Sequence, residues 1–365
     1  MNYLKEIQDK NLVYKLIQAI KKCNPGNRKI NFMEVCGTHT QSFFQNGLKS
    51  LLPDNLWLIS GPGCPVCVSD QSFIDKAIIF AKEKNTIIAT FGDMLRVPGT
   101  SSSLEKERAN GAKINLVYSI TDALDLAKTN PDKKIVFLAV GFETTIPTIA
   151  CGILEAEKQK LNNFFILSSL KLIPPALKNI VLDKEVKIDG FLCPGHVSAV
   201  IGTKPYQFIV NRYKIPCVIS GFEALDILEA IFLLLRQVVK NKAKVENQYQ
   251  RVVRKEGNPI AQKLTYKVFK KATVPWRGLG KISQSGLVLK DKYRKFDIEK
   301  NIKINFKPRL NRLNSKCICA DILKGKNSPG DCRSFASICK PENPLGPCMV
   351  SIEGTCNIYY RFGKN

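Results

Sequence analysis

The segment 61–67 carries two cysteines, Cys64 and Cys67, in a turn rich in Gly and Pro (GPGCPVC). It follows the apolar run 56–60, which predicts a strand, and precedes a helical pattern that begins at Gln71. At such a junction, free backbone N–H groups and the helix dipole favour the thiolate over the thiol. Two thiolates at this spacing can form a disulfide, hold a metal ion or do both in turn. A structural zinc site needs a second such pair. The chain has no other CxxC, so redox or metal chemistry is favoured.

A third cysteine, Cys36, follows the apolar run 30–35 in a second strand-to-helix turn, which again predicts a lowered thiol pKa. If the two strands are neighbours, three sulfurs converge. With a carboxylate such as Asp93 they suit a soft metal ion held with open positions. The only two histidines, His39 and His196, both lie in glycine turns at strand ends. His39, three residues after Cys36, can activate a thiolate or transfer a proton.

The tail over 316–365 holds six of the thirteen cysteines, with Gly and Pro between them. A segment with so little apolar core of its own needs a further stabilising element, which its six cysteines can provide. The long spacings between its cysteines favour a 4Fe-4S cluster over zinc, which prefers closely paired ligands. The favoured cluster ligands, followed by the two alternates that spacing leaves open, are Cys317, Cys332, Cys339 and Cys356, then Cys319 and Cys348. Cys23, Cys151 and Cys217 occur singly, which predicts buried small side chains.

The net charge is +25, and most of the excess falls between residues 236 and 312. A solvated basic surface is the simplest interpretation, and docking of an acidic protein is the next. Nucleic acid is the least favoured partner, because the basic residues form no long run and few aromatic residues lie among them. We expect neither a signal peptide nor a membrane span, and hence a cytoplasmic protein. In the cytoplasm, cysteine at this density indicates metal binding, an iron–sulfur cluster or redox chemistry.

Up to residue 235 the chain repeats one pattern, in which a short apolar run precedes a glycine turn and a helical pattern. This pattern predicts parallel βαβ units with strands over 30–35, 56–60, 86–91, 114–118, 134–140, 164–168, 188–192 and 215–220. We therefore expect an α/β fold with two parallel-sheet domains, over 1–120 and 121–240. The remainder, 241–365, is expected to combine a basic helical segment, with a long interrupted helix over 243–271, and a cysteine-rich iron–sulfur tail. Ligands of such folds gather at the carboxyl ends of the strands.

Five motifs resemble, in the same order and over essentially the whole chain, those of the HypD family of hydrogenase maturation factors. They are CGTH at 36–39, GPGCPVC at 61–67, GFETT at 141–145, PGHVS at 194–198 and the tail pattern Cys-x14-Cys-x6-Cys-x16-Cys. The resemblance implies a scaffold for the Fe(CN)2CO group of NiFe hydrogenases. Such a protein is a redox-active maturation scaffold rather than a conventional turnover enzyme.

In this family, the small chaperone HypC and the scaffold hold one iron between them, and HypE, with HypF, delivers cyanide. Carried over to this chain, the resemblance makes Cys36 the iron ligand. Cys64 and Cys67 become a thiol–disulfide couple near the iron, supplied with electrons by the tail cluster. His39 is then the local proton carrier, since Gln41 stands where the family often has a second histidine. The resemblance also places around the iron group or the partner Glu143, Thr144 and His196.

Two other classes remain open on the sequence alone. A stand-alone iron–sulfur thiol–disulfide oxidoreductase would use Cys64, Cys67 and the cluster, but would have no evident need for Cys36. A basic nucleic-acid-binding protein with a structural cluster would depend on the positive segment 236–312. Infrared bands from metal-bound CN and CO distinguish the scaffold from both.

Overall fold

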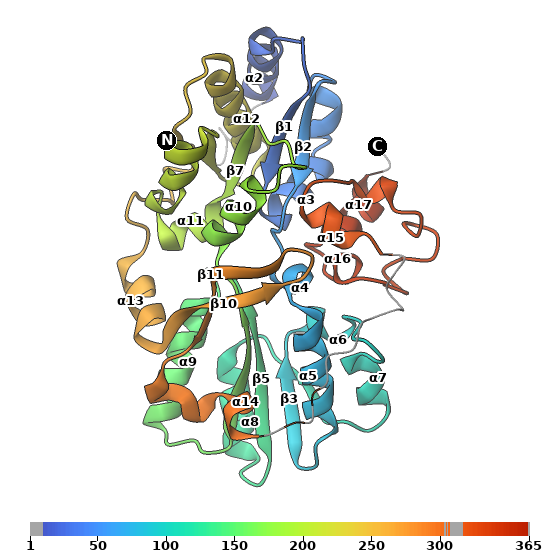
Figure 1. The fold of residues 1–365 in the computed structure, drawn as a ribbon, viewed down its shortest axis with the longest axis vertical. Coiled ribbons are helices and arrows are strands. Elements are labelled where there is room, and N and C mark those ends of the chain that lie inside the picture. Colours follow the sequence, from blue (N-terminus) through green and yellow to red (C-terminus); the bar gives the residue numbers. More distant parts are fainter. Residues whose placement is uncertain (1–9, 303, 305, 307–316, 364–365) are drawn as a thin grey trace.

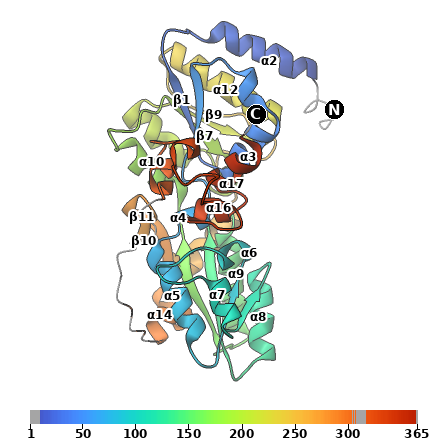
Figure 2. The ribbon, with the colours of Figure 1, turned by 90° about the vertical axis from the view of Figure 1, so that its right-hand side faces the viewer.

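The computed structural model describes residues 10–302, 304, 306 and 317–363. Two α/β lobes lie one above the other along the long axis of the molecule (Figure 1). A β-hairpin and the C-terminal tail lie beside the junction of the two lobes. The view from the side shows the tail helices in front of this junction, next to α3 and α4 (Figure 2).

The first lobe contains a five-stranded, all-parallel sheet in the order β2–β1–β7–β8–β9. Its strands are β1 (Ile30–Glu34), β2 (Leu56–Ser60), β7 (Gly190–Pro194), β8 (Cys217–Ser220) and β9 (Val245–Asn247). Every residue of β7 and β8 is buried, as expected for parallel strands covered on both faces. The helices of this lobe are α2 (Lys10–Cys23), α3 (Gly37–Gln45), α10 (Ile173–Val181), α11 (Gly195–Ile201) and α12 (Ala224–Val239), with the short turns η1 (Leu48–Leu51), η2 (Lys204–Tyr206) and η3 (Ile209–Tyr213).

The second lobe contains a four-stranded parallel sheet in the order β4–β3–β5–β6. Its strands are β3 (Thr86–Thr90), β4 (Ile114–Leu116), β5 (Lys134–Gly141) and β6 (Phe164–Leu170). Its helices are α5 (Gln71–Lys82), α6 (Gly92–Leu95), α7 (Leu104–Ala109), α8 (Ile120–Thr129) and α9 (Ile146–Lys158). The capping box of Ser119 and Asp122 satisfies backbone N–H groups at the start of α8, which explains why the helix begins there. The eight strands predicted in the first 235 residues are thus all confirmed, with small differences at their ends.

The two sheets are not separated in sequence at residue 120. The first sheet combines the strands at 30–60 with those at 190–247, and the whole second sheet, 86–170, lies between them in the chain. The chain passes from the first lobe to the second after β2 and returns after β6, and ends of strands from both sheets lie at this junction. Within the described residues, no helix has both the length and the apolar character needed to cross a membrane.

The region after residue 241 differs from the expected long helix. Residues 245–247 form β9, and only α13 (Pro259–Val268) is helical before an antiparallel hairpin of β10 (Phe269–Trp276) and β11 (Gly280–Leu289). The turn η4 (Asp291–Phe296) and α14 (Ile298–Asn301) follow. The two strands form an antiparallel ladder whose register shifts between Ala272 and Val274, so that a bulge interrupts their pairing.

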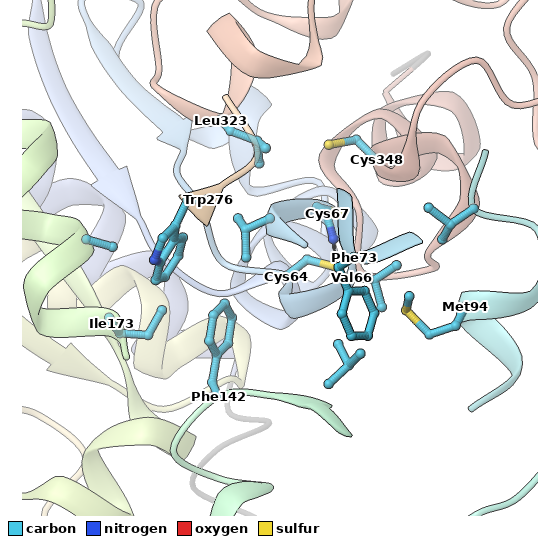
Figure 3. Close-up of a cluster of buried hydrophobic side chains, with 14 of the residues drawn as sticks. Cys64, Val66, Cys67, Phe73, Met94, Phe142, Ile173, Trp276, Leu323 and Cys348 are labelled. Atoms are coloured by element: carbon cyan, nitrogen blue, oxygen red, sulfur yellow. Dashed lines mark hydrogen bonds between the residues drawn. The ribbon is translucent and has the colours of Figure 1, made fainter. Parts of the chain in front are cut away.

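The tail has little regular structure, as its Gly and Pro content predicts. Its elements are α15 (Cys319–Leu323), η5 (Pro329–Asp331), α16 (Pro347–Val350) and α17 (Thr355–Phe362). Its buried residues belong to the same apolar core as α4 (Pro65–Val68), β5 and the hairpin. Figure 3 shows this core, in which Cys348 of the tail lies beside the helix that carries Cys64 and Cys67.

Candidate metal and redox site

Cys36 lies at the carboxyl end of β1, where the strand turns into α3. Its backbone N–H donates to the carboxylate of Glu34 (2.9 Å), which is buried at the end of the strand. The turn after β2 packs directly against this position, because a Cβ atom on Gly63 would lie 2.4 Å from the backbone nitrogen of Cys36. Only glycine permits this approach. The structure therefore brings the segment of Cys64 against Cys36, as the prediction of neighbouring strands requires.

Cys64 and Cys67 lie at the beginning and in the body of α4. Cys64 is the N-cap residue, and its Sγ accepts a hydrogen bond from the backbone N–H of Cys67 (3.4 Å). Pro65 occupies the first helical position, where no N–H is needed. Both thiols are buried and free. The CxxC spacing thus holds the two sulfur-bearing residues together in the form of a dithiol.

The predicted lowering of thiol pKa at this junction is wrong for Cys36 and Cys67. Burial raises the pKa of Cys36 to about 12, and the charges of Glu34 and Glu353 raise it further, against the hydrogen bond from Thr38. Burial also raises the pKa of Cys67 well above its ordinary value. Loss of hydration outweighs the dipoles of two short helices. A buried thiol beside carboxylates loses its proton when a cation binds, so this environment suits a metal ligand.

The tail brings further sulfur to the same junction. Cys348 lies on α16, which packs against α4, and its thiol interacts with that of Cys67. The Cys348 thiol also interacts with Cys319 on α15 and with Cys356 on α17. Cys319 interacts in turn with Cys317. A continuous line of sulfur contacts therefore leads from the CxxC pair into the tail.

Three of the four favoured cluster ligands, Cys317, Cys339 and Cys356, lie along this line. The thiol of Cys339 is within electrostatic reach of those of Cys317 and Cys356, and burial raises its pKa. Cys332 follows η5 and is partly buried. Within the described residues, no three His, Cys, Asp or Glu side chains already have the arrangement of a metal site.

The surroundings nevertheless fit an iron–sulfur cluster. The backbone N–H of Leu345 donates to Sγ of Cys339 (3.3 Å), the kind of hydrogen bond that tunes cluster sulfur. A Cβ atom on Gly346 would lie 2.7 Å from Sγ of Cys317, so the backbone approaches the sulfur as closely as glycine allows. The buried Nη2 of Arg277 has no hydrogen-bond partner. Such an orphaned donor costs about 1–3 kcal/mol, and a sulfur-rich anion beside it would accept its hydrogen bond.

Two carboxylates complete the junction on the side of the second lobe. The hydroxyl of Ser351 donates to Oδ2 of Asp93 (2.7 Å). Burial and the charge of Asp93 raise the pKa of Glu353, and a hydrogen bond from Thr38 opposes them. Glu353 thus links the segment of Cys36 to that of Asp93. The sequence pattern placed Asp93 near the sulfurs but gave no role to Glu34 or Glu353.

A cavity of about 610 Å³ opens beside these carboxylates, at the carboxyl ends of β3, β4 and β5. Pro65 and Val66 of α4 form part of its wall, and Asp93, Thr144 and Glu353 form another part. This is the position at which parallel sheets bind ligands. Of the GFETT motif, Thr144 and Thr145 line this cavity.

Glu143, in contrast, points away from the cavity. One oxygen of its buried carboxylate accepts the backbone N–H of Ile173 (2.9 Å) at the start of α10, and the other has no partner. Burial raises the pKa of Glu143 to about 7, against these backbone bonds and the charge of Lys271. The structure therefore gives Glu143 a place at a helix N-terminus instead of one near the sulfurs.

The two histidines lie against the same phenylalanine. The ring of Phe222 stacks on that of His39 (4.6 Å between centroids) and on that of His196 (3.9 Å). His39 is fully buried, and its Nε2–H donates to the backbone oxygens of Ser220 and Gly221. Burial lowers its pKa to about 4, so the ring is neutral near pH 7 and can accept a proton only at Nδ1, which has no partner.

The isolated cysteines only partly follow the prediction. Cys217 is buried, but Cys151 is exposed and Cys23 is partly buried, so the prediction is wrong for these two. Cys193 of β7, which no motif singled out, interacts with Cys217 of the neighbouring strand, and burial raises its pKa. These residues lie outside the sulfur junction and take no part in the argument below.

Taken together, these features define a class of protein: an α/β protein in which buried thiols from two strand ends and a cysteine-rich tail meet at one junction. Comparison with known proteins narrows the class. A family model named HypD, with the description hydrogenase formation hypA family, matches residues 11–363. The chain belongs to the HypD family of hydrogenase maturation factors.

Individual relatives agree with this assignment over their full length. A putative hydrogenase expression/formation protein of Methanocaldococcus jannaschii is 43% identical, covering 98% of this chain and 99% of that protein. Hydrogenase maturation factor HypD of Cupriavidus necator is 42% identical, with coverage of 100% and 98%. HypD2 of Bradyrhizobium diazoefficiens is also 42% identical, with coverage of 100% and 97%.

Proposed function

We propose that this protein scaffolds assembly of the Fe(CN)2CO group of NiFe hydrogenases, together with a HypC-like chaperone. HypE, with HypF, donates the cyanide. The observation that carries the proposal is the junction at which Cys36, the pair of Cys64 and Cys67, and the tail thiols meet. Iron is the cargo in this proposal, and Cys36 is its ligand from this chain. The carboxylates of Glu34 and Glu353 favour a cation at this sulfur.

The dithiol supplies the electrons for cyanide transfer. Releasing cyanide from a thiocyanate-like carrier breaks one S–C bond (R–S–CN + 2e⁻ + H⁺ → R–SH + CN⁻). Cys64 and Cys67 provide both electrons when they close to a disulfide, and they release two protons. One proton completes the carrier thiol. The other proton passes to solvent, because burial lowers the pKa of His39 to about 4 and makes its imidazole a weak base.

The tail restores the dithiol. Cys319 and Cys348 lie between Cys67 and the remaining tail cysteines, so we infer that they form a second dithiol, which reduces the first by thiol–disulfide exchange. Such exchange conserves electrons, because one disulfide opens as the other forms. A 4Fe-4S cluster held by Cys317, Cys332, Cys339 and Cys356 would supply single electrons at this end.

The partner proteins have two surfaces available in this proposal. Among the described residues between 236 and 302, basic side chains belong to α13 and to the β10–β11 hairpin, where they would attract an acidic partner and raise its association rate more than its final affinity. The cavity with Thr144 and Asp93 opens beside α4, where the carrier end of a cyanide donor would reach the dithiol.

The alternative is a stand-alone iron–sulfur thiol–disulfide oxidoreductase. It shares the sulfur line from Cys67 into the tail, but it leaves the glycine-permitted contact at Cys36 and the two carboxylates beside this thiol without a purpose. Thiol trapping of the reduced and the air-oxidised protein tests what both functions share: the peptide with Cys64 and Cys67 should differ by two protons. Full alkylation of both after oxidation would remove the redox role.

The experiment that separates the two functions is anaerobic purification after co-expression with a HypC-like partner, followed by infrared spectroscopy. The scaffold gives bands of metal-bound CN and CO, and an oxidoreductase gives none. Co-expression without HypE is the control, because it should retain the partner and iron but lose the CN bands. A complex that contains iron and never shows these bands would contradict the proposal.

A further inference from the structure

Arg277, in the turn between β10 and β11, forms hydrogen bonds with the end of α4, the helix of the CxxC pair. Its backbone N–H donates to the carbonyl oxygen of Val68 (2.9 Å), and its Nε donates to that of Ser69 (2.8 Å). Its Nη1 donates to the side chain of Gln71 (2.9 Å). Three hydrogen bonds from one residue thus fix the end of α4, the helix of Cys64 and Cys67, although no motif indicated this arginine.

The same turn also touches the tail. Gly278 has a φ of +78°, and a Cβ atom on it would lie 2.7 Å from Cα of Ala320, so the turn packs on α15 next to Cys319. The guanidinium of Arg277 lies within electrostatic reach of the thiols of Cys317 and Cys319. Its Nη2 is buried and has no partner. The charge of Arg277 is therefore close to the sulfur end of the tail, and one of its buried donors is unsatisfied.

We propose that Arg277 is a positioning residue that fixes α4 against α15 and raises the reduction potential of the cluster held by the tail. The inference rests on the function proposed above. Reduction adds one electron, and hence one negative charge, beside a buried cation whose free N–H can donate to sulfur. Both interactions favour the reduced state, since charge and hydrogen bonds to sulfur set the potentials of such clusters.

Lysine cannot take over both parts of this role. Its point charge would preserve much of the electrostatic effect, but it lacks the planar fork that binds Ser69 and Gln71 and leaves a further buried nitrogen, Nη2, free. The two parts can therefore be separated. Arg277→Lys keeps the charge but loses the side-chain hydrogen bonds that hold the end of α4. Arg277→Gln loses the charge as well.

The test uses the full chain after anaerobic reconstitution, titrated with dithionite and followed by absorbance and electron paramagnetic resonance. Arg277→Gln should bind the same amount of iron and sulfide, but its cluster should be about tenfold harder to reduce, which is about 59 mV for one electron. Arg277→Lys should stay near the wild-type potential, yet re-reduce the disulfide of Cys64 and Cys67 more slowly in thiol trapping. Lys281→Gln, which removes an exposed cation from the same hairpin, is the matched control and should change neither.

An unchanged potential in Arg277→Gln, with wild-type cluster content, would overturn this inference and leave the proposed function intact. A wild-type chain that takes up no cluster refutes the role of the tail, and this inference with it. If Arg277→Gln does not fold, Arg277→Lys carries the test, and re-reduction at the wild-type rate then counts against the positioning role.

Discussion

The two sulfur regions of the molecule are both buried, but the charges beside them are opposite. Cys36 has the carboxylates of Glu34 and Glu353 as neighbours, and Cys317 and Cys319 have the guanidinium of Arg277. Burial alone disfavours a thiolate in both places. Under the proposed function, the charged neighbours determine which bound group offsets the cost of burying the thiolate. This group is a cation at Cys36 and an anionic, sulfur-rich group in the tail. Under the proposed function, cysteine binds the cargo in one region and takes part in electron supply in the other, and the charged neighbours distinguish the two.

Removing the sulfur of Cys36 should give the largest effect. Cys36→Ser keeps the shape of the side chain and replaces sulfur with a hydroxyl, which is a far weaker ligand for low-spin iron. We expect complete loss of the CN and CO infrared bands and of hydrogenase maturation. Folding and the brown colour of the tail cluster should be unchanged. Bands of wild-type intensity in this variant would show that the iron is held elsewhere.

Loss of a cluster ligand in the tail should remove the colour of the cluster, which Cys36→Ser leaves unchanged. Reconstituted wild-type protein should contain about four irons and four sulfides per chain, and Cys332→Ala should lose the brown chromophore. Cys348→Ala is the informative comparison, because we assign Cys348 to the second dithiol and not to the cluster. It should keep the colour while the disulfide of Cys64 and Cys67 is no longer reduced. A colourless wild-type protein with one tightly bound zinc would contradict both expectations.

A smaller effect should follow from the carboxylate beside Cys36. Glu353→Gln keeps the size of the side chain and its link to Thr38, but removes the negative charge that favours a cation. Neighbours of metal ligands typically contribute about 10–100-fold to affinity, so we expect iron binding by the complex to weaken within this range. Glu342→Gln, at an exposed position of the tail, is the matched control. Equal affinities of the two variants would remove Glu353 from the site.

The smallest effect concerns a buried carboxylate outside both sulfur regions. The pKa of Glu143 rises from 4.5 to about 7 on folding, so the folded chain binds more protons than the unfolded chain between these values. Its contribution to stability therefore falls as pH rises through this window, by at most about 1.4 kcal/mol per pH unit. Urea unfolding of the apoprotein should show a shallower decline for Glu143→Gln than for the wild type. Identical pH profiles would show that Glu143 is not protonated on folding.

Local patterns in the sequence were sufficient to locate the strands and the turns that carry the cysteines. Each apolar run before a glycine turn is a strand, and Cys36, Cys64 and Asp93 lie at strand ends or directly after them. The order of strands could not be obtained in this way, because parallel pairing joins residues far apart in the chain. The pairing of β1 with β7 (Phe32 with Gly190) has no local signal.

The charge states at the site were predicted with the wrong sign for a related reason. Helix N-termini favour thiolates, and this is visible in the sequence. Burial of the thiols by the tail is not visible in the sequence, since Cys348 reaches Cys67 only in the folded chain. The hairpin was also missed, because its irregular pairing, with a register shift between Ala272 and Val274, leaves no strand period in the sequence. Without the hairpin, Arg277 could not be placed beside the sulfurs.

The interruption of the first sheet by the second has a consequence for synthesis on the ribosome. All strands of the second sheet, 86–170, leave the ribosome before β7 can pair with β1, so the second lobe has the first opportunity to fold. The thiols of Cys36, Cys64 and Cys67 emerge early, but α16, which packs on α4 and brings Cys348 to Cys67, is made only after almost the whole chain. At ~5–20 residues per second this interval lasts roughly 15–60 s. During that time the nascent thiols are exposed to oxidants and to competing metal ions, and the tail closes over them last.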